Sequence, residues 1–127
     1  MPAYFVAQYV VNDLAKYRNY QKGAGPAIEK YGGKLVAFDV AARIIEGKPP
    51  GPQTVILEFK DDEALNRWYN SKEYQAVVNG RLEATEGFGV AAQSMNPARL
   101  APSIGGSRQV QIDPGAVARV DVTSRRY

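Results

Sequence analysis

Two carboxylates in strand-like runs are the residues of this sequence best suited to acid/base chemistry. Glu58 lies in the apolar run 54–59, and Asp39 lies in the apolar run 36–40, with Arg43 two alternations further on as its expected partner. If helices cover the face that holds such a carboxylate, desolvation raises its pKa and suits it to act as a general acid or base. The alternatives are an ion pair with a helix arginine for Glu58 and a solvent-facing position on an edge strand for Asp39. We predict Asp39 and Glu58 as catalytic residues.

Aromatic and polar side chains supply the rest of the predicted site. Tyrosine hydroxyls can donate a proton to an oxyanion that develops during a reaction. Tyr20 and Tyr69 are therefore the other predicted catalytic residues. Side chains at helical spacing more often form core, and a strand glutamine or a helix arginine is more often exposed, so each of these residues also has a structural interpretation. The predicted substrate-binding residues are Tyr4, Gln8, Tyr17, Arg43, Trp68, Tyr74 and Arg81.

Two residue types are absent from the sequence, and their absence narrows the chemistry. There is no cysteine and no histidine. Thiolate nucleophiles, disulfides, Ser-His-Asp catalysis and most zinc or iron sites are excluded for this sequence. A metal site built from carboxylates alone would need clustered Asp and Glu, and no calcium-loop spacing occurs. We predict neither a metal nor an organic cofactor.

Composition argues against nucleic acid and membrane as partners. The net charge is +3 over 127 residues, and the basic residues are dispersed, with Arg125 and Arg126 the adjacent pair. Nucleic-acid binding favours a clustered basic stripe. No apolar run approaches the roughly 20 residues of a membrane span. Because the first residues lack a basic segment followed by an apolar signal core, we expect a cytoplasmic protein.

The elements that must position these residues follow from periodicity and turn residues. Asn12 or Asp13 is an expected helix cap, as are Asp61 or Asp62 and then Ser71. Gly23 to Pro26 is expected to kink or interrupt the first helix, because proline lacks an amide donor. The order β-α-β-β-α-β predicts an α+β fold, the ferredoxin-like split plait. The expected strands are 3–11, 34–46, 53–60 and 88–95, and the expected helices are 13–31, 61–70 and 72–82.

One face of the predicted sheet looks too apolar for a monomer to expose. We predict that this face packs against a second copy, which gives a homodimer. Gln8 lies on the opposite face with Tyr4. The side chains of the predicted dimer face are Phe5, Ala7, Tyr9, Val55, Leu57 and Phe59.

Several blocks of the sequence resemble one family. They are residues 1–5, 31–33, 46–47, 55–59 and 68–75, the last reading Trp-Tyr-Asn-Ser-Lys-Glu-Tyr-Gln. Together they closely resemble the family called domain of unknown function 1330, in the dimeric α/β-barrel group, over about residues 1–95. The resemblance implies a ferredoxin-like protomer whose sheet packs against that of its twin. It implies no activity, although related barrels include cofactor-free monooxygenases, decarboxylases, cyclases and muconolactone-type isomerases.

The sequence departs from that family in two places. Residues 38–43 place Asp39 and Arg43 where family members usually carry a glycine-rich turn. The chain also continues as an extension over residues 96–127, whereas 1–95 form the predicted ferredoxin-like domain. We expect the extension to be an extended arm that crosses to the partner subunit or covers the pocket, the alternative being a disordered tail.

The leading functional prediction is a cofactor-independent enzyme that acts on a small molecule by acid/base chemistry. A cyclase, isomerase or dehydratase of specialised biosynthesis fits a carboxylate base with tyrosine, Gln8 or Arg43 stabilising an oxyanion. One alternative is a non-catalytic small-molecule-binding or pathway accessory protein. The other is a cofactor-free monooxygenase, in which the substrate itself activates oxygen. The sequence does not name the substrate.

Overall fold

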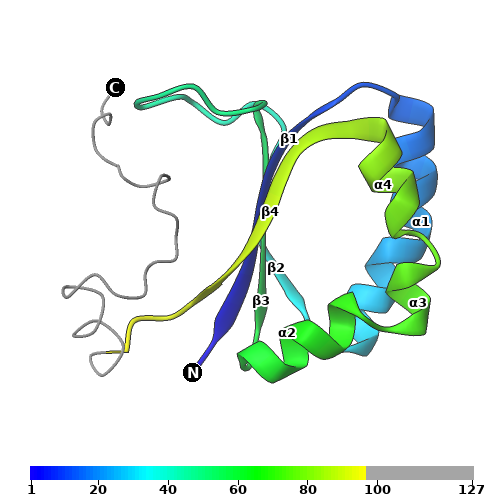
Figure 1. Ribbon diagram of the computed structural model, residues 1–127, viewed down its shortest axis with the longest axis vertical. Helices are drawn as coiled ribbons and strands as arrows, with labels where there is room; N and C mark the ends of the chain where they lie inside the picture. Colours follow the sequence, from blue (N-terminus) through cyan, green and yellow to red (C-terminus); the bar gives the residue numbers. More distant parts are fainter. Residues whose placement is uncertain (97–127) are drawn as a thin grey trace. The chain divides into compact units, whose positions relative to one another are not determined.

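The structure, a computed structural model, describes residues 1–96 of the 127. The elements alternate in the order β-α-β-β-α-β, with the second helical segment divided into three short helices (Figure 1). The predicted α+β class is confirmed. The elements are β1 Ala3–Val11, α1 Leu14–Lys30, β2 Lys34–Asp39, β3 Gln53–Phe59, α2 Asp62–Tyr69, α3 Lys72–Gln75, α4 Val78–Ala84 and β4 Thr85–Gln93.

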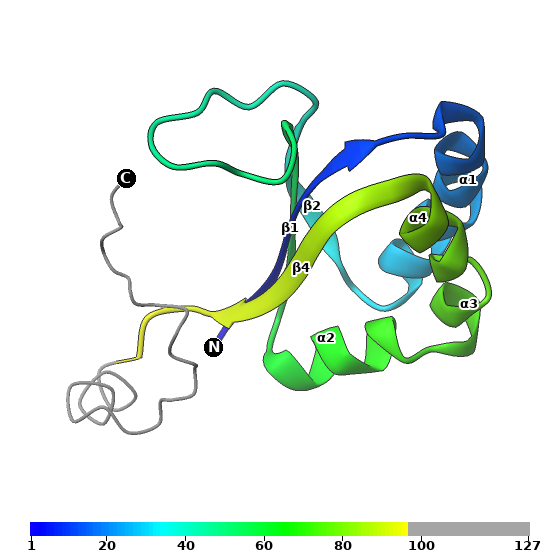
Figure 2. The same ribbon diagram turned by 45° about the horizontal axis from the view of Figure 1, so that its top comes forward.

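The four strands form one antiparallel sheet in the order β2-β3-β1-β4. The two central strands are β1 and β3, which pair from Ala3 opposite Phe59 to Tyr9 opposite Gln53. All four helices lie on the same side of the sheet (Figures 1 and 2). This arrangement is the predicted ferredoxin-like plait.

The alternation of strand residues divides the sheet into a helix-covered face and a helix-free face. Along β1, Ala3, Phe5, Ala7 and Tyr9 are buried against the helices, whereas the even-numbered residues between them are only partly buried. Within residues 1–96, no helix packs on the helix-free face (Figure 1). The helix-free face carries Tyr4, Val6, Gln8, Val10, Thr54, Ile56, Glu58, Phe88, Val90 and Ala92.

The prediction of the dimer face was therefore wrong. The apolar face assigned to a partner subunit is the helix-covered face, and its side chains already form the core of the protomer. Helices α1, α2 and α4 bury this face by packing their own apolar residues on it. The residues concerned are Phe5, Ala7, Tyr9, Val55, Leu57 and Phe59.

The helix starts confirm the predicted caps. Asp13 accepts a hydrogen bond from the backbone N–H of Lys16 at 3.0 Å, and Asp61 accepts one from that of Ala64 at 2.8 Å. Ser71 does the same for Tyr74 at 3.0 Å, which starts α3 directly after α2. Each side chain satisfies an amide that has no partner within its own helix.

Three predicted boundaries differ from the structure. Helix α1 continues through Pro26 without a break, because Ala24 and Ala27 on either side of it are buried in the core. Strand β2 ends at Asp39 rather than residue 46, since the Asp39 carboxylate accepts the N–H of Ala41 at 2.9 Å and turns the chain. Strand β4 begins at Thr85, directly after α4, rather than at residue 88.

Two further predictions concern the chain beyond the sheet. No helix within residues 1–96 is long and apolar enough to cross a membrane. Nearly all of the predicted extension, from residue 97 onward, lies outside the described residues, and with it the prediction of an arm that reaches the partner subunit or the pocket.

Candidate small-molecule site

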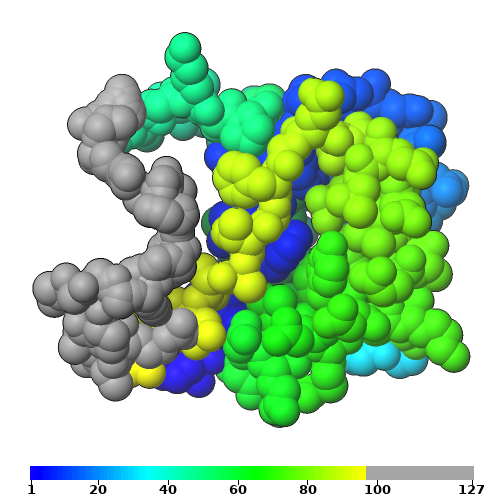
Figure 3. Space-filling view, in the orientation of Figure 1, coloured from blue at the N-terminus to red at the C-terminus, as the bar shows by residue number. Residues whose placement is uncertain are grey.

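One cavity lies between β4 and the helices α2 and α4, and we call it the β4 cavity. Its volume is about 550 Å³. The residues of β4 that face the helices are Gly87, Gly89 and Ala91, which project little or nothing into this space. A Cβ atom on Gly89 would lie 2.6 Å from the ring of Phe5, so the glycine lets that ring form the floor. Figure 3 shows the resulting hollow between β4 and the helices.

A second cavity lies between the sheet and α1, and we call it the α1 cavity. Its volume is about 170 Å³. Apolar residues of α1, β2 and β3 form much of its wall, among them Ala24, Ile28 and Val55. Phe5 and Arg81 line both cavities. These two residues therefore mark the boundary between one cavity and the other.

Arg81 is a buried cation without an anionic partner. Its residue exposure is 6%, and no carboxylate within residues 1–96 forms an ion pair with it at 4.0 Å or less. Its Nε makes no hydrogen bond to the described residues. The guanidinium carbon lies 5.8 Å from the ring centre of Phe5 and 5.7 Å from that of Tyr9, both within range of a cation–π interaction. Arg81 is thus held by aromatic faces and not by a counter-charge.

The charge state of Arg81 is secure despite its burial. Burial on its own lowers the pKa of the guanidinium, but the neighbouring Tyr74 and Tyr20 hydroxyl groups outweigh burial, and the pKa is raised. Taking a charge out of water still costs several kcal/mol, and a partner normally offsets that cost. An anion bound in the cavity would supply the missing partner.

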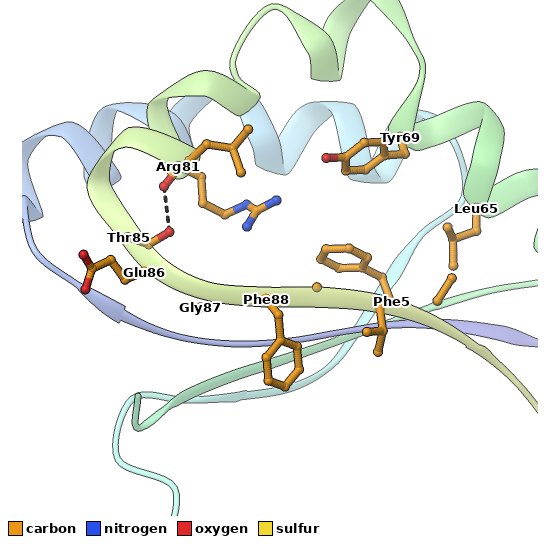
Figure 4. A pocket seen from close by; sticks show the side chains of 12 residues that line it. Phe5, Leu65, Tyr69, Arg81, Thr85, Glu86, Gly87 and Phe88 are labelled. Carbon is orange, nitrogen blue, oxygen red and sulfur yellow. Dashed lines mark hydrogen bonds between the residues drawn. The ribbon is translucent and has the colours of Figure 1, made fainter. Parts of the chain in front are cut away.

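Two more side chains that line the cavities carry a donor without a hydrogen-bond partner, Tyr69 at the β4 cavity and Trp68 at the α1 cavity. Figure 4 shows the Arg81 guanidinium and the Tyr69 hydroxyl pointing toward one another above the Phe5 ring. The Tyr69 hydroxyl has no hydrogen bond to another residue in the described part of the chain, nor does the buried indole Nε1 of Trp68. Because Arg81 and Tyr69 both donate and neither carries a negative charge, the β4 cavity favours a ligand with acceptor oxygens.

The remaining tyrosines around the α1 cavity are hydrogen-bonded to one another. The hydroxyls of Tyr9 and Tyr17 are 2.8 Å apart, and Gln53 Nε2 donates to Tyr17 at 2.8 Å. The hydroxyls of Tyr20 and Tyr74 are 2.7 Å apart. Burial raises the pKa of Tyr9, Tyr17 and Tyr20 above the ordinary value. These phenols therefore stay protonated at neutral pH and do not act as bases there.

The structure gathers about half of the predicted site residues around the two cavities. Tyr17, Tyr20, Trp68 and Tyr74 line the α1 cavity, Tyr69 lines the β4 cavity, and Arg81 lines both. Tyr4, Gln8 and Glu58 instead lie on the helix-free face, where Tyr4 is opposite Glu58 across β1 and β3. Gln8 donates to the Thr54 hydroxyl at 3.1 Å on that same face.

The carboxylate base predicted for the pocket is not in either cavity wall. Glu58 does not lie beneath the helices as expected, because the helices cover the opposite face of β3. Asp39 is exposed at the end of β2, and its carboxylate closes a turn to Ala41 rather than pairing with Arg43. Arg43 is exposed in the loop after β2. Within residues 1–96, no group of three or more acidic residues is arranged to hold a metal ion.

Three residues of the site were missing from the predicted set. Phe5 and Tyr9 were assigned to the dimer face, and Gln53 was considered only as the start of a strand. The signal in the sequence is that Gln8, Thr54 and Glu58 make the opposite face of these strands the more polar one. The more apolar face of a sheet is the one that helices cover.

Comparisons with known proteins agree with this fold. A family model described as a domain of unknown function (DUF1330) matches residues 2–94. Among solved structures, the RPA0582 protein of unknown function from Rhodopseudomonas palustris is similar, with a TM-score of 0.63 and 18% identity over 76% of this chain and 84% of that chain. The methylated form of RPA0582 also gives a TM-score of 0.63 at 18% identity, over 76% of this chain and 82% of that one. No curated protein matches this sequence.

Proposed function

Because this chain belongs to the DUF1330 family, whose description assigns no activity, we propose a function from its own cavity: it binds a small, largely apolar organic anion. The observation that carries the proposal is the buried guanidinium of Arg81, whose Nε has no hydrogen-bond partner and which has no carboxylate within 4.0 Å in residues 1–96. A carboxylate or enolate placed above Phe5 would accept hydrogen bonds from Arg81 and Tyr69 together. Charge-assisted bonds of this kind are roughly twice as strong as neutral ones.

The aromatic walls favour a ligand that is apolar away from its charge. Phe5, Tyr69 and Leu65 border the β4 cavity, whose volume of about 550 Å³ lies in the range of small-molecule sites, roughly 300–1,000 Å³. Aromatic and conjugated carboxylates satisfy both requirements. Benzoate and cinnamate are therefore the first probes.

The test separates ligand binding from folding. Arg81→Met removes a buried charge that has no anionic partner, so the melting temperature of the variant should stay the same or rise. Its affinity for benzoate or cinnamate, measured by isothermal titration calorimetry, should fall roughly 10- to 100-fold, as expected when a hydrogen bond to a charged group is lost. Arg67→Met is the matched control, because Arg67 is exposed on α2 and lies 4.0 Å from Glu63.

Two outcomes would reject the proposal. One is equal binding of benzamide and benzoate, because the neutral amide cannot use the counter-charge of Arg81. The other is a large drop in the melting temperature of Arg81→Met with unchanged benzoate affinity, which would make Arg81 a structural residue.

A cofactor-independent isomerase or cyclase is the second candidate function. The convergence of Arg81 and Tyr69 favours it, because two donors aimed at one position would stabilise an enolate that forms during proton transfer. Of the described residues that line the β4 cavity, Glu86 is the one with a carboxylate, but it lies opposite Val10 and its carboxylate points away from Arg81 and Tyr69 (Figure 4), so it is not the base in this proposal. Tyr69→Phe should lower the turnover of an enolisable substrate by roughly 100-fold while leaving its binding largely intact, since it removes one of the two donors to the enolate; unchanged turnover would reject this role.

We further propose that the chain forms a homodimer through the helix-free face. Phe88 and Val90 on this face are 45% and 50% exposed, and Val6 and Ile56 lie beside them. A second copy presents the same apolar surface, so a two-fold contact would cover both. Native mass spectrometry should report two chains per particle, and Val90→Lys should shift the particle to one chain. A wild-type particle of one chain at micromolar concentration would disprove the dimer.

A further inference from the structure

The two cavities together point to a ligand with two parts. Building on the anion site proposed above, we propose that the ligand carries a ring-sized apolar group in addition to its acid, and that this group occupies the α1 cavity. The ligand class is then an arylalkanoate or a conjugated acid of similar shape. Its carboxylate is bound at Arg81 and Tyr69, and its ring lies between the sheet and α1.

The position of Arg81 makes a shared ligand possible. Arg81 and Phe5 line both cavities, so a carboxylate held by the guanidinium is at the entrance to the α1 cavity. The guanidinium carbon is 5.8 Å from the centre of the Phe5 ring. The methylene chain attached to the acid must then run past this pair into the α1 cavity.

The chemistry of the α1 cavity suits a ring and not a second charge. The hydroxyls of Tyr20 and Tyr74 bond to each other, as do those of Tyr9 and Tyr17, so these residues present mainly their ring faces to the cavity. Trp68 adds a further aromatic wall, with its ring centre 4.4 Å from that of Tyr74 and its indole Nε1 still without a hydrogen-bond partner among the described residues. Aromatic side chains pack favourably against another ring in edge-to-face or offset geometry.

The size of the α1 cavity matches one ring. Its volume is about 170 Å³. An apolar protein cavity of roughly 150 Å³ is large enough to bind benzene. A fused pair of rings would exceed this space, whereas a methyl group would leave most of it empty.

The outer rim of the α1 cavity supports the same conclusion. Leu35 and Phe38 on the edge strand β2 line the cavity, yet they are 56% and 44% exposed. Both project to the helix side of the sheet, opposite Leu57 and Val55 of β3. These two apolar side chains are only partly covered within the protomer. An apolar group in the cavity would cover more of them.

The affinity ratio between two acids measures the contribution of the ring. Isothermal titration calorimetry would compare acetate, hexanoate, 3-phenylpropanoate and 4-phenylbutanoate. Burying a phenyl group should make one of the two phenyl acids bind roughly 10- to 100-fold tighter than acetate, since apolar burial contributes about 25 cal/mol per Å². Hexanoate, which reaches the cavity but has no ring, should lie between acetate and the better phenyl acid.

Two variants fill the α1 cavity from different sides. Gly25→Leu adds a side chain at the cavity wall where the new Cβ meets no atom within 4 Å. Ala24→Leu fills the cavity from the buried side of the same helix. In each variant the ratio of phenyl-acid affinity to acetate affinity should fall toward one. Ala15→Leu, at an exposed position of α1 outside both linings, should keep the wild-type ratio.

The outcomes distinguish this inference from the function on which it rests. If all the acids bind with equal affinity and Arg81→Met weakens each of them, the anion site stands and the two-part ligand is wrong. If both leucine variants keep the wild-type ratio, the ring lies outside the α1 cavity and the inference is likewise wrong. If no acid depends on Arg81, the anion site itself fails.

Discussion

The two faces of the sheet are built from the same strands, yet they differ in whether their polar groups need a hydrogen-bond partner from the protein. On the helix-covered face, the tyrosine hydroxyls are hydrogen-bonded in pairs, because an unpaired polar group away from water costs free energy. On the helix-free face, Gln8 and Thr54 pair while Glu58 remains partly exposed with Tyr4 opposite it. A missing partner is ordinary where water reaches the residue. It is informative only where burial should have required one, as at Arg81.

The comparison predicts that the largest effect on stability comes from the helix-covered face. Trp68 is fully buried and its ring contacts Phe5, Phe59 and Tyr74. Trp68→Ala should lower the free energy of unfolding by about 3–5 kcal/mol in urea titration. Phe88→Ala on the helix-free face, measured in dilute solution, should cost less than about 1 kcal/mol. Equal losses would mean that the two faces do not differ as described.

The paired hydroxyls predict an intermediate effect. Tyr20→Phe leaves the buried Tyr74 hydroxyl without its partner at 2.7 Å and should cost about 1–3 kcal/mol. The double variant Tyr20→Phe/Tyr74→Phe removes both hydroxyls and should be closer to wild type than either single variant. A double-mutant cycle in urea tests this coupling. Strictly additive losses would show that the two hydroxyls act independently.

An ion pair on the outer surface of the helices predicts a smaller, pH-dependent effect. The Lys30 ammonium and the Tyr31 hydroxyl donate to the Glu73 carboxylate and lower its pKa from 4.5 to about 2. A depressed folded-state pKa stabilises the protein above the unfolded value, and this contribution is lost as the pH falls from 4.5 toward 2. Glu73→Gln should therefore be less stable than wild type at pH 6, and the difference should vanish near pH 2. A difference that stays constant over this range would contradict the ion pair.

The smallest effect is expected at the carboxylate that the sequence first suggested. Glu58→Gln, on the helix-free face, should change the free energy of unfolding of the protomer by no more than about 0.5 kcal/mol. It should also leave benzoate affinity unchanged, because Glu58 lines neither cavity. A loss of benzoate binding in this variant would show that benzoate binds on the helix-free face, which contradicts the proposed site in the β4 cavity.

The backbone of this domain was largely predictable because local signals agree with it. Asp13, Asp61 and Ser71 each cap the helix that follows, and the strand order follows from the β-α-β-β-α-β succession. The end of β2 was not predictable from alternation alone, because the turn depends on a bond between the Asp39 side chain and the Ala41 backbone. Pro26 predicted a break in the first helix that the structure does not have. Burial of neighbouring residues of α1 in the core outweighs the cost of the backbone hydrogen bond that the proline cannot donate.

The site was only partly predictable because alternation separates two faces without saying which one is covered. Phe5 and Tyr9 were placed on the right face of β1, but that face was assigned to the wrong neighbour. Arg81 was predicted to bind substrate, with an exposed helix arginine as its structural interpretation. Its burial brings the guanidinium carbon to within 5.8 Å and 5.7 Å of the ring centres of Phe5 and Tyr9 on β1, which are distant from it in the chain. Such contacts have no local signature.

Trp68 has a consequence for how this protein can be studied. It is the one tryptophan of the sequence, it is fully buried, and it lines the α1 cavity. The intrinsic fluorescence of the chain excited at the indole band therefore originates from a single wall of that cavity. A ring that enters beside it would change the emission, so the protein carries its own optical sensor for occupancy.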